Sequence, residues 1–214
     1  MSSVDLQLAT DLARLANIRR AVETGTYKAK TARKLSAIFP TVVTIELDVA
    51  LHAAAVQTLS DLPGVTARQG HSVAVLSDVA GDGAEPTFYF LDGHWSGGVT
   101  SGAEDECPVI EELAAIGTGH PDDCIVIDDA HMFTSAPAPP MDPAKWPTLL
   151  EVFDALRGYR PDHFITLLAG QVVSVPQSAR PAVDAYGQRA RQDELSLVER
   201  AVGAAFQVRE RVRR

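Results

Sequence analysis

Carboxylates follow two strongly apolar segments of this sequence. Residues 88–91 read Phe-Tyr-Phe-Leu and precede Asp92, and residues 124–127 read Cys-Ile-Val-Ile and precede Asp128 and Asp129. Such segments are typical of buried strands, and the carboxyl ends of parallel strands meet at one edge of a sheet. Three carboxylates at one place without a cation would be driven toward protonation. We therefore predict a divalent cation held by Asp92, Asp128 and Asp129, with Mg²⁺ first and Mn²⁺ second.

Because histidines lie near these acids, neither the identity of the metal nor the proton acceptor is fixed by the acids alone. His94 and His131 stand close to the predicted ligands, and a bond from either would favour Mn, Fe or Zn. Because imidazole titrates near neutral pH, His94 is the preferred proton acceptor, with Asp92 as the second choice. The simpler alternative is that strand-end acids cap the following helices, which suits Asp48, Asp105 or one of the Asp128–Asp129 pair.

The charge of the chain is unevenly placed. The 214 residues carry a net charge of −9, and no Lys or Arg lies between Arg68 and Lys145, where fourteen acids occur. Such a surface is unsuited to phosphate backbones, so we expect no nucleic-acid partner. The sequence contains no apolar run of membrane-spanning length, and its start does not resemble a signal peptide, so we expect a cytoplasmic protein without membrane contact. The two cysteines, Cys107 and Cys124, are expected to be reduced and structural.

The order of apolar segments predicts the elements that position these residues. Short apolar runs alternate with helical patterns of about ten residues, which indicates parallel strands joined by crossover helices. Residues 164–168 and 172–175 read as a hairpin around Gly170. We predict a single α/β domain over 1–214, with a Rossmann-like, doubly wound, mostly parallel seven-stranded sheet and a C-terminal antiparallel strand. An N-terminal helix (1–19) precedes the core (20–176), and an Arg-rich C-terminal helix (177–214) could join two copies in a homo-oligomer.

The first two strand ends suggest a nucleoside-like ligand. Glu23-Thr24-Gly25-Thr26 places a glycine in a strand-to-helix turn, where backbone can approach a ligand closely. Glu46, roughly twenty residues on, is placed to accept hydrogen bonds from ribose hydroxyls. A plain tight turn is an equally good interpretation of the glycine alone.

Together these segments resemble the class I S-adenosylmethionine-dependent O-methyltransferases, and most closely their metal-dependent branch of macrocin O-methyltransferase-like, cephalosporin-hydroxylase-like and catechol O-methyltransferase-like proteins. The similar segments are residues 22–32 (Val-Glu-Thr-Gly-Thr-Tyr-Lys-Ala-Lys-Thr-Ala), 44–48 (Thr-Ile-Glu-Leu-Asp), 70–72 (Gly-His-Ser), 90–95 (Phe-Leu-Asp-Gly-His-Trp) and 127–131 (Ile-Asp-Asp-Ala-His).

The resemblance implies a cofactor, a reaction and a set of residues. S-adenosylmethionine would be bound by Glu23, Gly25, Thr26, Glu46, Leu47, His71, Ser72 and Asp92. Metal at Asp92, Asp128 and Asp129 would bind a hydroxyl of a small acceptor, such as a sugar or secondary metabolite, and His94 or Asp92 would take its proton. Two positions depart from the family pattern, since Ala29 replaces its second glycine and His71 replaces an acid near the adenine.

Two other functions remain open from the sequence. The same scaffold could carry a different metal enzyme, a hydrolase or oxygenase that uses His94 and the aspartates. It could also belong to a non-catalytic binding or assembly protein, with the C-terminal helix as its interface.

Overall fold

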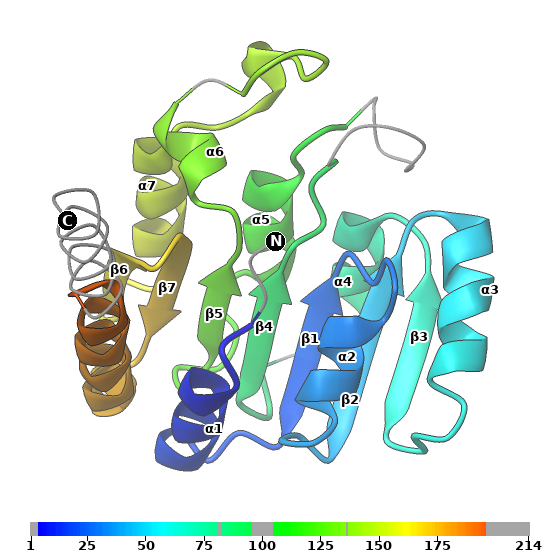
Figure 1. The fold of residues 1–214 in the computed structure, drawn as a ribbon, viewed down its shortest axis with the longest axis horizontal. Coiled ribbons are helices and arrows are strands. Elements are labelled where there is room, and N and C mark those ends of the chain that lie inside the picture. Colours follow the sequence, from blue (N-terminus) through cyan, green and yellow to red (C-terminus); the bar gives the residue numbers. More distant parts are fainter. Residues whose placement is uncertain (1–3, 81–82, 96–104, 136, 196–214) are drawn as a thin grey trace, which may run out of the picture.

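A seven-stranded sheet forms the centre of the computed structural model, which describes residues 4–80, 83–95, 105–135 and 137–195 (Figure 1). The strand order is β3-β2-β1-β4-β5-β7-β6. The strands are β1 (Arg20–Thr24), β2 (Thr41–Glu46), β3 (Val65–Gln69), β4 (Thr87–Leu91), β5 (Cys124–Ile127), β6 (Phe164–Leu168) and β7 (Gln171–Val175).

Pairing directions confirm the predicted mixed sheet. β1 to β5 are parallel, whereas β7 runs antiparallel to both β5 and β6. The β6–β7 hairpin turns at Ala169 and Gly170, both with positive φ (49° and 82°), as a two-residue turn of this twist requires. The antiparallel strand β7 is inserted beside β5, so β6 forms the edge of the sheet.

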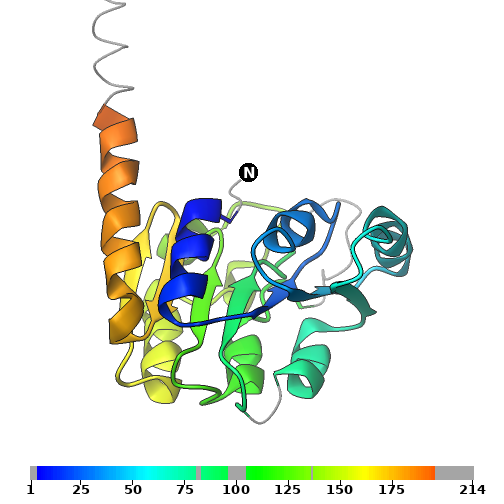
Figure 2. The same cartoon turned by 90° about the horizontal axis from the view of Figure 1, so that it is seen from below.

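Helices cover both faces of the sheet in three layers, as Figure 2 shows from below. One face carries α4 (Ser72–Val79), α5 (Val109–Ile116) and α7 (Leu149–Tyr159), which pack on a core that includes Tyr89 and Ile125. The other carries α1 (Leu6–Leu15), α2 (Lys30–Leu35) and α3 (Val49–Thr58). Smaller elements are α6 (His131–Thr134), η1 (Pro143–Lys145) and η2 (Gln177–Ala179). All polar strand ends predicted to carry chemistry thus open onto the single edge that these layers leave uncovered.

Residues 180–195 form a helix that leans on α1 and then extends beyond the sheet (Figure 2). Ala182 and Val183 are buried against the core, whereas residues 191–195 are exposed. The remainder of the predicted C-terminal helix lies outside the described residues, and its role in a homo-oligomer, like the single-domain assignment, stays a prediction. Within the described ranges, no helix combines the length and the apolar character that crossing a bilayer requires. Cys107 and Cys124 are both free and buried, as expected.

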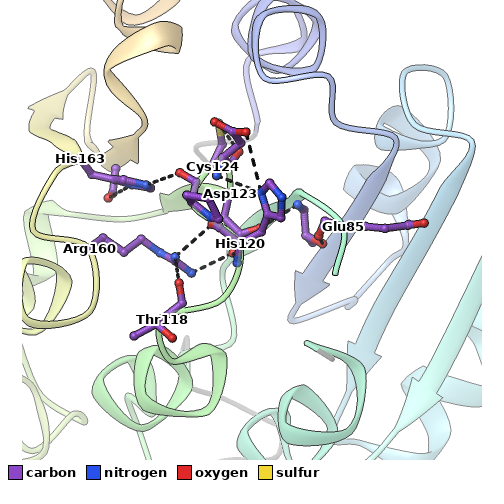
Figure 3. A network of polar contacts seen from close by, with 11 residues as sticks. Glu85, Thr118, His120, Asp123, Cys124, Arg160 and His163 are labelled. Atoms are coloured by element: carbon purple, nitrogen blue, oxygen red, sulfur yellow. Dashed lines mark hydrogen bonds and ion pairs between the residues drawn. The ribbon is translucent and has the colours of Figure 1, made fainter. Parts of the chain in front are cut away.

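A buried ion pair closes the amino edge of the sheet, opposite the predicted site (Figure 3). Arg160 at the end of α7 donates to the Asp123 carboxylate over 2.9 Å, and both side chains are at most 2% exposed. Asp123 also accepts the backbone N–H groups of Thr87 (2.8 Å) and His120 (3.0 Å). Arg160 donates further to the Thr118 carbonyl. This network fixes α7 against the start of β4 and β5.

Candidate active site

The ends of β1 and β4 touch at the carboxyl edge of the sheet. A Cβ on Gly25, which follows β1 with φ +81°, would lie 2.2 Å from the backbone oxygen of Asp92, so no larger residue fits there. Asp92 N–H in turn donates to the Thr24 carbonyl over 3.2 Å. The predicted cofactor turn and the first predicted metal ligand are therefore neighbours.

Asp92, His94 and Asp129 form a compact group of acids and imidazole. One ligand atom from each of the three lies within 4.8 Å of the others. His94 Nε2 is 3.2 Å from Asp129 Oδ2, and His94 Nδ1 is 3.6 Å from Asp92 Oδ1. His94 is 10% exposed, whereas the two acids are about one-third exposed, at 32% and 33%. The group is open on its acidic side and can receive a cation or a substrate.

Asp128 is placed differently from the two other predicted ligands. It is 2% exposed, and its Oδ1 accepts a hydrogen bond from Gln171 Nε2 over 3.1 Å. It does not belong to the compact group, although its charge acts on Asp92. The structure thus brings Asp92 and Asp129 together with His94, and places Asp128 behind them.

Helix capping does not explain the Asp128–Asp129 pair. The short helix α6 has Ala130 as its N-cap and no side-chain cap. Asp48, by contrast, caps α3 through bonds from Ala50 N–H (2.8 Å) and Leu51 N–H (2.9 Å). Asp129 has a φ of +50°, a left-handed conformation that is uncommon for non-glycine residues, although Asp adopts it more readily than most.

The pKa values of the group reflect burial first and the neighbouring charges second. Burial raises the pKa of Asp92 to about 7; the charge of His94 opposes this, while Asp128 and Asp129 add to it. Burial alone would lower the pKa of His94, but its contact with Asp129 and the charge of Asp92 raise it overall. The bond from His94 lowers the pKa of Asp129. The side chain of His131 is 69% exposed, and its Nδ1 is 3.7 Å from Asp129 Oδ1, so His131 lies at the rim of the acidic group.

Glu23 forms the floor of the predicted cofactor turn. It is 1% exposed, and burial raises its pKa to about 8. The Thr44 hydroxyl donates to it over 2.5 Å, so the Thr26 hydroxyl, 2.6 Å from that of Thr44, must be the donor in its own contact. This series of hydrogen bonds ties β1 to β2 below the turn, so Glu23 and Thr26 stabilise the structure in this state.

Glu46 and Leu47 end β2 beside the turn. The two oxygens of Glu46 accept Tyr27 N–H (2.7 Å) and Asp48 N–H (2.9 Å). A carboxylate oxygen has two lone pairs, so both oxygens can still accept ribose hydroxyls. Leu47 is 37% exposed, an apolar surface next to that acid.

The loop between β1 and α2 has an unusual backbone for its residue types. Tyr27 and Ala29 both have positive φ, at 46° and 57°, and Ala29 is the N-cap of α2. Ala29 is 1% exposed. Ala29, which stands at the second glycine position of the resembled cofactor motif, therefore keeps a conformation that glycine adopts at lower cost.

His71 and Ser72 lie where α4 begins, close to the segment that follows β4. His71 Nε2 is 3.0 Å from Asp105 Oδ2, in an exposed pair that joins the two segments. Asp105 is thus a partner of His71, and it caps no described helix.

Three side chains at this edge are missing from the sequence-based site. Glu106, 3% exposed, accepts Trp146 Nε1–H (3.0 Å) and Asp142 N–H (2.9 Å), which anchors residues 142–146. Trp146 packs edge-on against His94, with ring centroids 5.5 Å apart. Glu112 is 1% exposed. Its position could have been noticed, because the buried stripe of α5 reads Val109, Glu112, Leu113, Ile116, with a carboxylate on the apolar face.

Comparisons with known proteins establish the fold. No protein-family model matches the sequence, and neither does any curated protein. Among solved structures, a protein from Klebsiella pneumoniae described as an O-methyltransferase superposes with a TM-score of 0.57, at 15% identity over 82% of this chain and 81% of that one. TomG is an O-methyltransferase of Streptomyces achromogenes that is involved in tomaymycin synthesis and was solved with SAM. It superposes with a TM-score of 0.54, at 19% identity over 81% of this chain and 82% of that one. An O-methyltransferase of Bacillus cereus that was solved with SAH superposes with a TM-score of 0.52, at 17% identity over 82% of each chain. The chain therefore has the fold of class I methyltransferases.

Proposed function

We propose that this protein transfers a methyl group from S-adenosylmethionine to a hydroxyl of a small acceptor, such as a sugar or a secondary metabolite, with the help of a divalent cation. The observation that carries the proposal is the contact between the Gly25 turn and Asp92, because it brings the turn predicted to bind the cofactor next to a group of acids. Similar structures that are O-methyltransferases hold SAM or SAH, which supports the same cofactor here.

The residues at the crevice fit an adenosyl cofactor. Gly25 lets the turn after β1 pack directly on the Asp92 backbone, Glu46 keeps lone pairs for ribose hydroxyls, and Leu47 offers an apolar surface to the purine. His71 and Ser72 lie at the start of α4, which follows β3, the neighbour of β2. Glu23 and Thr26 act from beneath, by holding β1 and β2 in register.

The acidic group fits a divalent cation. Asp92 and Asp129 offer carboxylate oxygens and His94 offers a nitrogen, with Asp128 close behind as a further charge. A cation bound there would lower the pKa of an acceptor hydroxyl and hold its oxygen in place. Because the described group includes an imidazole, it suits Mn²⁺ as well as the Mg²⁺ expected from oxygen ligands alone.

The chain's own residues handle the proton and the geometry. When bound, S-adenosylmethionine would supply a methyl group whose C–S bond would break as its bond to the acceptor oxygen forms, releasing S-adenosylhomocysteine. If Asp92 and Asp129 hold the cation, His94 would take the hydroxyl proton; if the His94 nitrogen also binds the cation, an unliganded oxygen of Asp92 would take it. Asp129 and Trp146 hold the His94 ring, and the contact between Gly25 and Asp92 keeps the predicted cofactor turn next to the acids.

Calorimetric titration with S-adenosylmethionine, with and without Mg²⁺ or Mn²⁺, tests the proposal. We expect cofactor binding in the micromolar range and methylation of hydroxylated acceptors that depends on the cation. Absence of cofactor binding at millimolar concentration would refute it.

A second candidate is a different metal enzyme, a hydrolase or oxygenase, on the same scaffold. The nitrogen of His94 within the acidic group favours it, because imidazole suits Fe and Zn. Metal analysis of the purified protein separates the two, since tightly held Fe or Zn without cofactor binding would support this candidate.

A further inference from the structure

Glu106 is a buried carboxylate that connects two segments at the carboxyl edge of the sheet. It is 3% exposed. Its Oε2 accepts both the indole N–H of Trp146 (3.0 Å) and the backbone N–H of Asp142 (2.9 Å), and Lys145 Nζ lies 3.8 Å from its Oε1. Its backbone oxygen accepts the N–H of Trp95 over 2.7 Å. Glu106 thus connects the segment that follows β4 to the segment that ends at Trp146.

The indole ring of Trp146 touches both segments that carry the acidic group. Trp146 is 8% exposed, and its ring packs edge-on against His94, with centroids 5.5 Å apart and an interplanar angle of 64°. It also contacts Phe133 of α6, with centroids 6.3 Å apart. Trp146 therefore packs on the segments that follow β4 and β5, where the predicted metal ligands stand.

The orientation of the His94 ring depends on this packing. Nε2 of His94 is 3.2 Å from Asp129 Oδ2, within hydrogen-bonding distance, whereas its Nδ1 is 3.6 Å from Asp92 Oδ1, which is too long for a hydrogen bond. Because only one ring nitrogen is bonded to an acid, packing has to keep the other nitrogen turned toward Asp92. Trp146 is the aromatic partner of His94 among the described residues.

We propose that Glu106 is a positioning residue of this site: by accepting the indole N–H it fixes the ring of Trp146, and this ring keeps His94 turned toward Asp92. The catalytic consequence rests on the proposed function, in which His94 takes the hydroxyl proton or binds the cation. The position of the His94 ring does not rest on it, so it can be measured without cofactor, cation or acceptor.

NMR spectroscopy of protein labelled with ¹³C in its histidine rings tests this inference, at one pH and without divalent ions. The spectrum of His94→Gln identifies the His94 signal among the six histidines, and that of Trp146→Phe identifies the indole protons. Glu106→Leu removes the acceptor, whereas Glu106→Gln keeps one acceptor oxygen. Glu111→Leu, at an exposed acid of α5, is the matched control for the same exchange of residue type.

In the wild type we expect nuclear Overhauser effects between the ring protons of His94 and Trp146, because the rings are in edge contact. Glu106→Leu should shift the His94 signal and remove these effects, and the signal of His163 at the amino edge should not change. Glu106→Gln and Glu111→Leu should match the wild type. A residue that only anchored a surface segment would leave the His94 signal in place.

Methyl transfer gives a second measurement under the proposed function. Glu106→Leu should lower kcat about 10- to 100-fold, the usual effect of removing a residue that orients a metal site from behind, and should leave the KM for S-adenosylmethionine unchanged. Glu106→Gln should restore most of the rate, because its amide oxygen can still accept the two N–H groups.

The outcomes separate this inference from the proposed function. A folded Glu106→Leu that keeps the His94 signal would overturn the inference, and so would a Glu106→Gln that behaves like Glu106→Leu. The contact between the rings of His94 and Trp146 is measured in the wild type, so its absence would overturn the inference even if Glu106→Leu does not fold. A protein that binds no S-adenosylmethionine but shows the expected His94 signals would refute the proposed function and support the positioning by Glu106.

Discussion

Carboxylates lie at both edges of the sheet, fully buried at the amino edge and partly exposed at the carboxyl edge, and their partners differ. At the amino edge, Asp123 accepts two backbone N–H groups and pairs with Arg160 (Figure 3). At the carboxyl edge, Asp92 and Asp129 have histidine as their cationic partner among the described residues. The same type of side chain is thus neutralised within the protein at one edge and left in need of a cation at the other.

This difference separates stability from function along a single sheet. The amino-edge pair is formed by the chain itself and ties α7 to the sheet, although burial raises the pKa of Asp123 and lowers that of Arg160. At the carboxyl edge, burial and mutual repulsion raise the pKa of Asp92 to about 7, and burial raises that of Glu23 to about 8. Holding these groups ionised costs folding free energy, which a bound cation would offset.

Breaking the amino-edge pair should have the largest effect on stability. Arg160→Met leaves Asp123 buried and unpaired, and we expect the free energy of unfolding to fall by about 3–5 kcal/mol. Urea denaturation measures the loss. The control, Arg157→Met, changes an exposed arginine on the same helix and should stay within about 0.5 kcal/mol. A loss below 1 kcal/mol in Arg160→Met would show that the two edges do not differ as described.

Adding a cation should act only at the carboxyl edge. A divalent ion at 100 times its dissociation constant should stabilise the folded protein by about 2.7 kcal/mol. Thermal unfolding in increasing Mn²⁺ or Mg²⁺ measures this, and the electron paramagnetic resonance spectrum of Mn²⁺ reports binding directly. Asp129→Ala should abolish both signals, whereas Asp122→Ala, which alters an acid near the amino edge, should keep them. If the cation stabilised Asp129→Ala and Asp122→Ala equally, its binding site would lie elsewhere in the protein.

Removing one charge at the carboxyl edge should stabilise the metal-free protein. The pKa of Asp92 is higher in the folded state than its unfolded value of about 3.9, so its cost is absent below pH 4 and grows as the pH rises to about 7. We expect Asp92→Asn to raise the free energy of unfolding by about 1–2 kcal/mol at pH 8 and by almost nothing at pH 4. The value at pH 8 is smaller than the full pKa shift implies, because one-third of the side chain is exposed to solvent. Urea denaturation at both pH values without divalent ions measures the difference.

The opposite sign would mean that Asp92 is stabilised in its ionised form without a metal. Under the proposed function the same variant should lose methyl transfer by at least about 100-fold, because a ligand and proton acceptor is removed. Higher stability together with lower activity is the pattern expected of a site under electrostatic strain.

Much of the fold could be predicted because its signals are local. The apolar runs 88–91 and 124–127 coincide with β4 and β5 to within one residue, and the hairpin of β6 and β7 turns at Gly170 as predicted. The proximity of Asp92 to the Gly25 turn also follows from topology, since parallel strands end at one edge. The order of β6 and β7 was less accessible, because a hairpin can join a sheet by either strand.

The details of the site depend on contacts between distant residues. Gln171 reaches Asp128 only because β7 pairs with β5, and no spacing in the sequence indicates that bond. His94 lies between Asp92 and Asp129 through the path of the segment that follows β4. Glu112 left a readable signal, a carboxylate on the apolar stripe of α5, but its closeness to Gly93 at the end of β4 follows only from the folded structure.

An effect smaller than that of Arg160→Met is expected from the hydrogen bond that the uncharged Gln171 side chain donates to Asp128 behind the acidic group. Gln171→Met keeps the volume of the side chain but removes this donor, and we expect the free energy of unfolding to fall by about 1.5 kcal/mol, the low end for a hydrogen bond to a charged group. Gln57→Met, at an exposed position, controls for the change of residue type. Urea denaturation measures both. Because Arg160 carries a full charge and Gln171 only a dipole, the cost of losing the partner should differ at least twofold between the two edges. A Gln171→Met loss as large as that of Arg160→Met would show instead that Asp128 is held as firmly as Asp123, and that the carboxyl edge is built to be rigid before any cation binds.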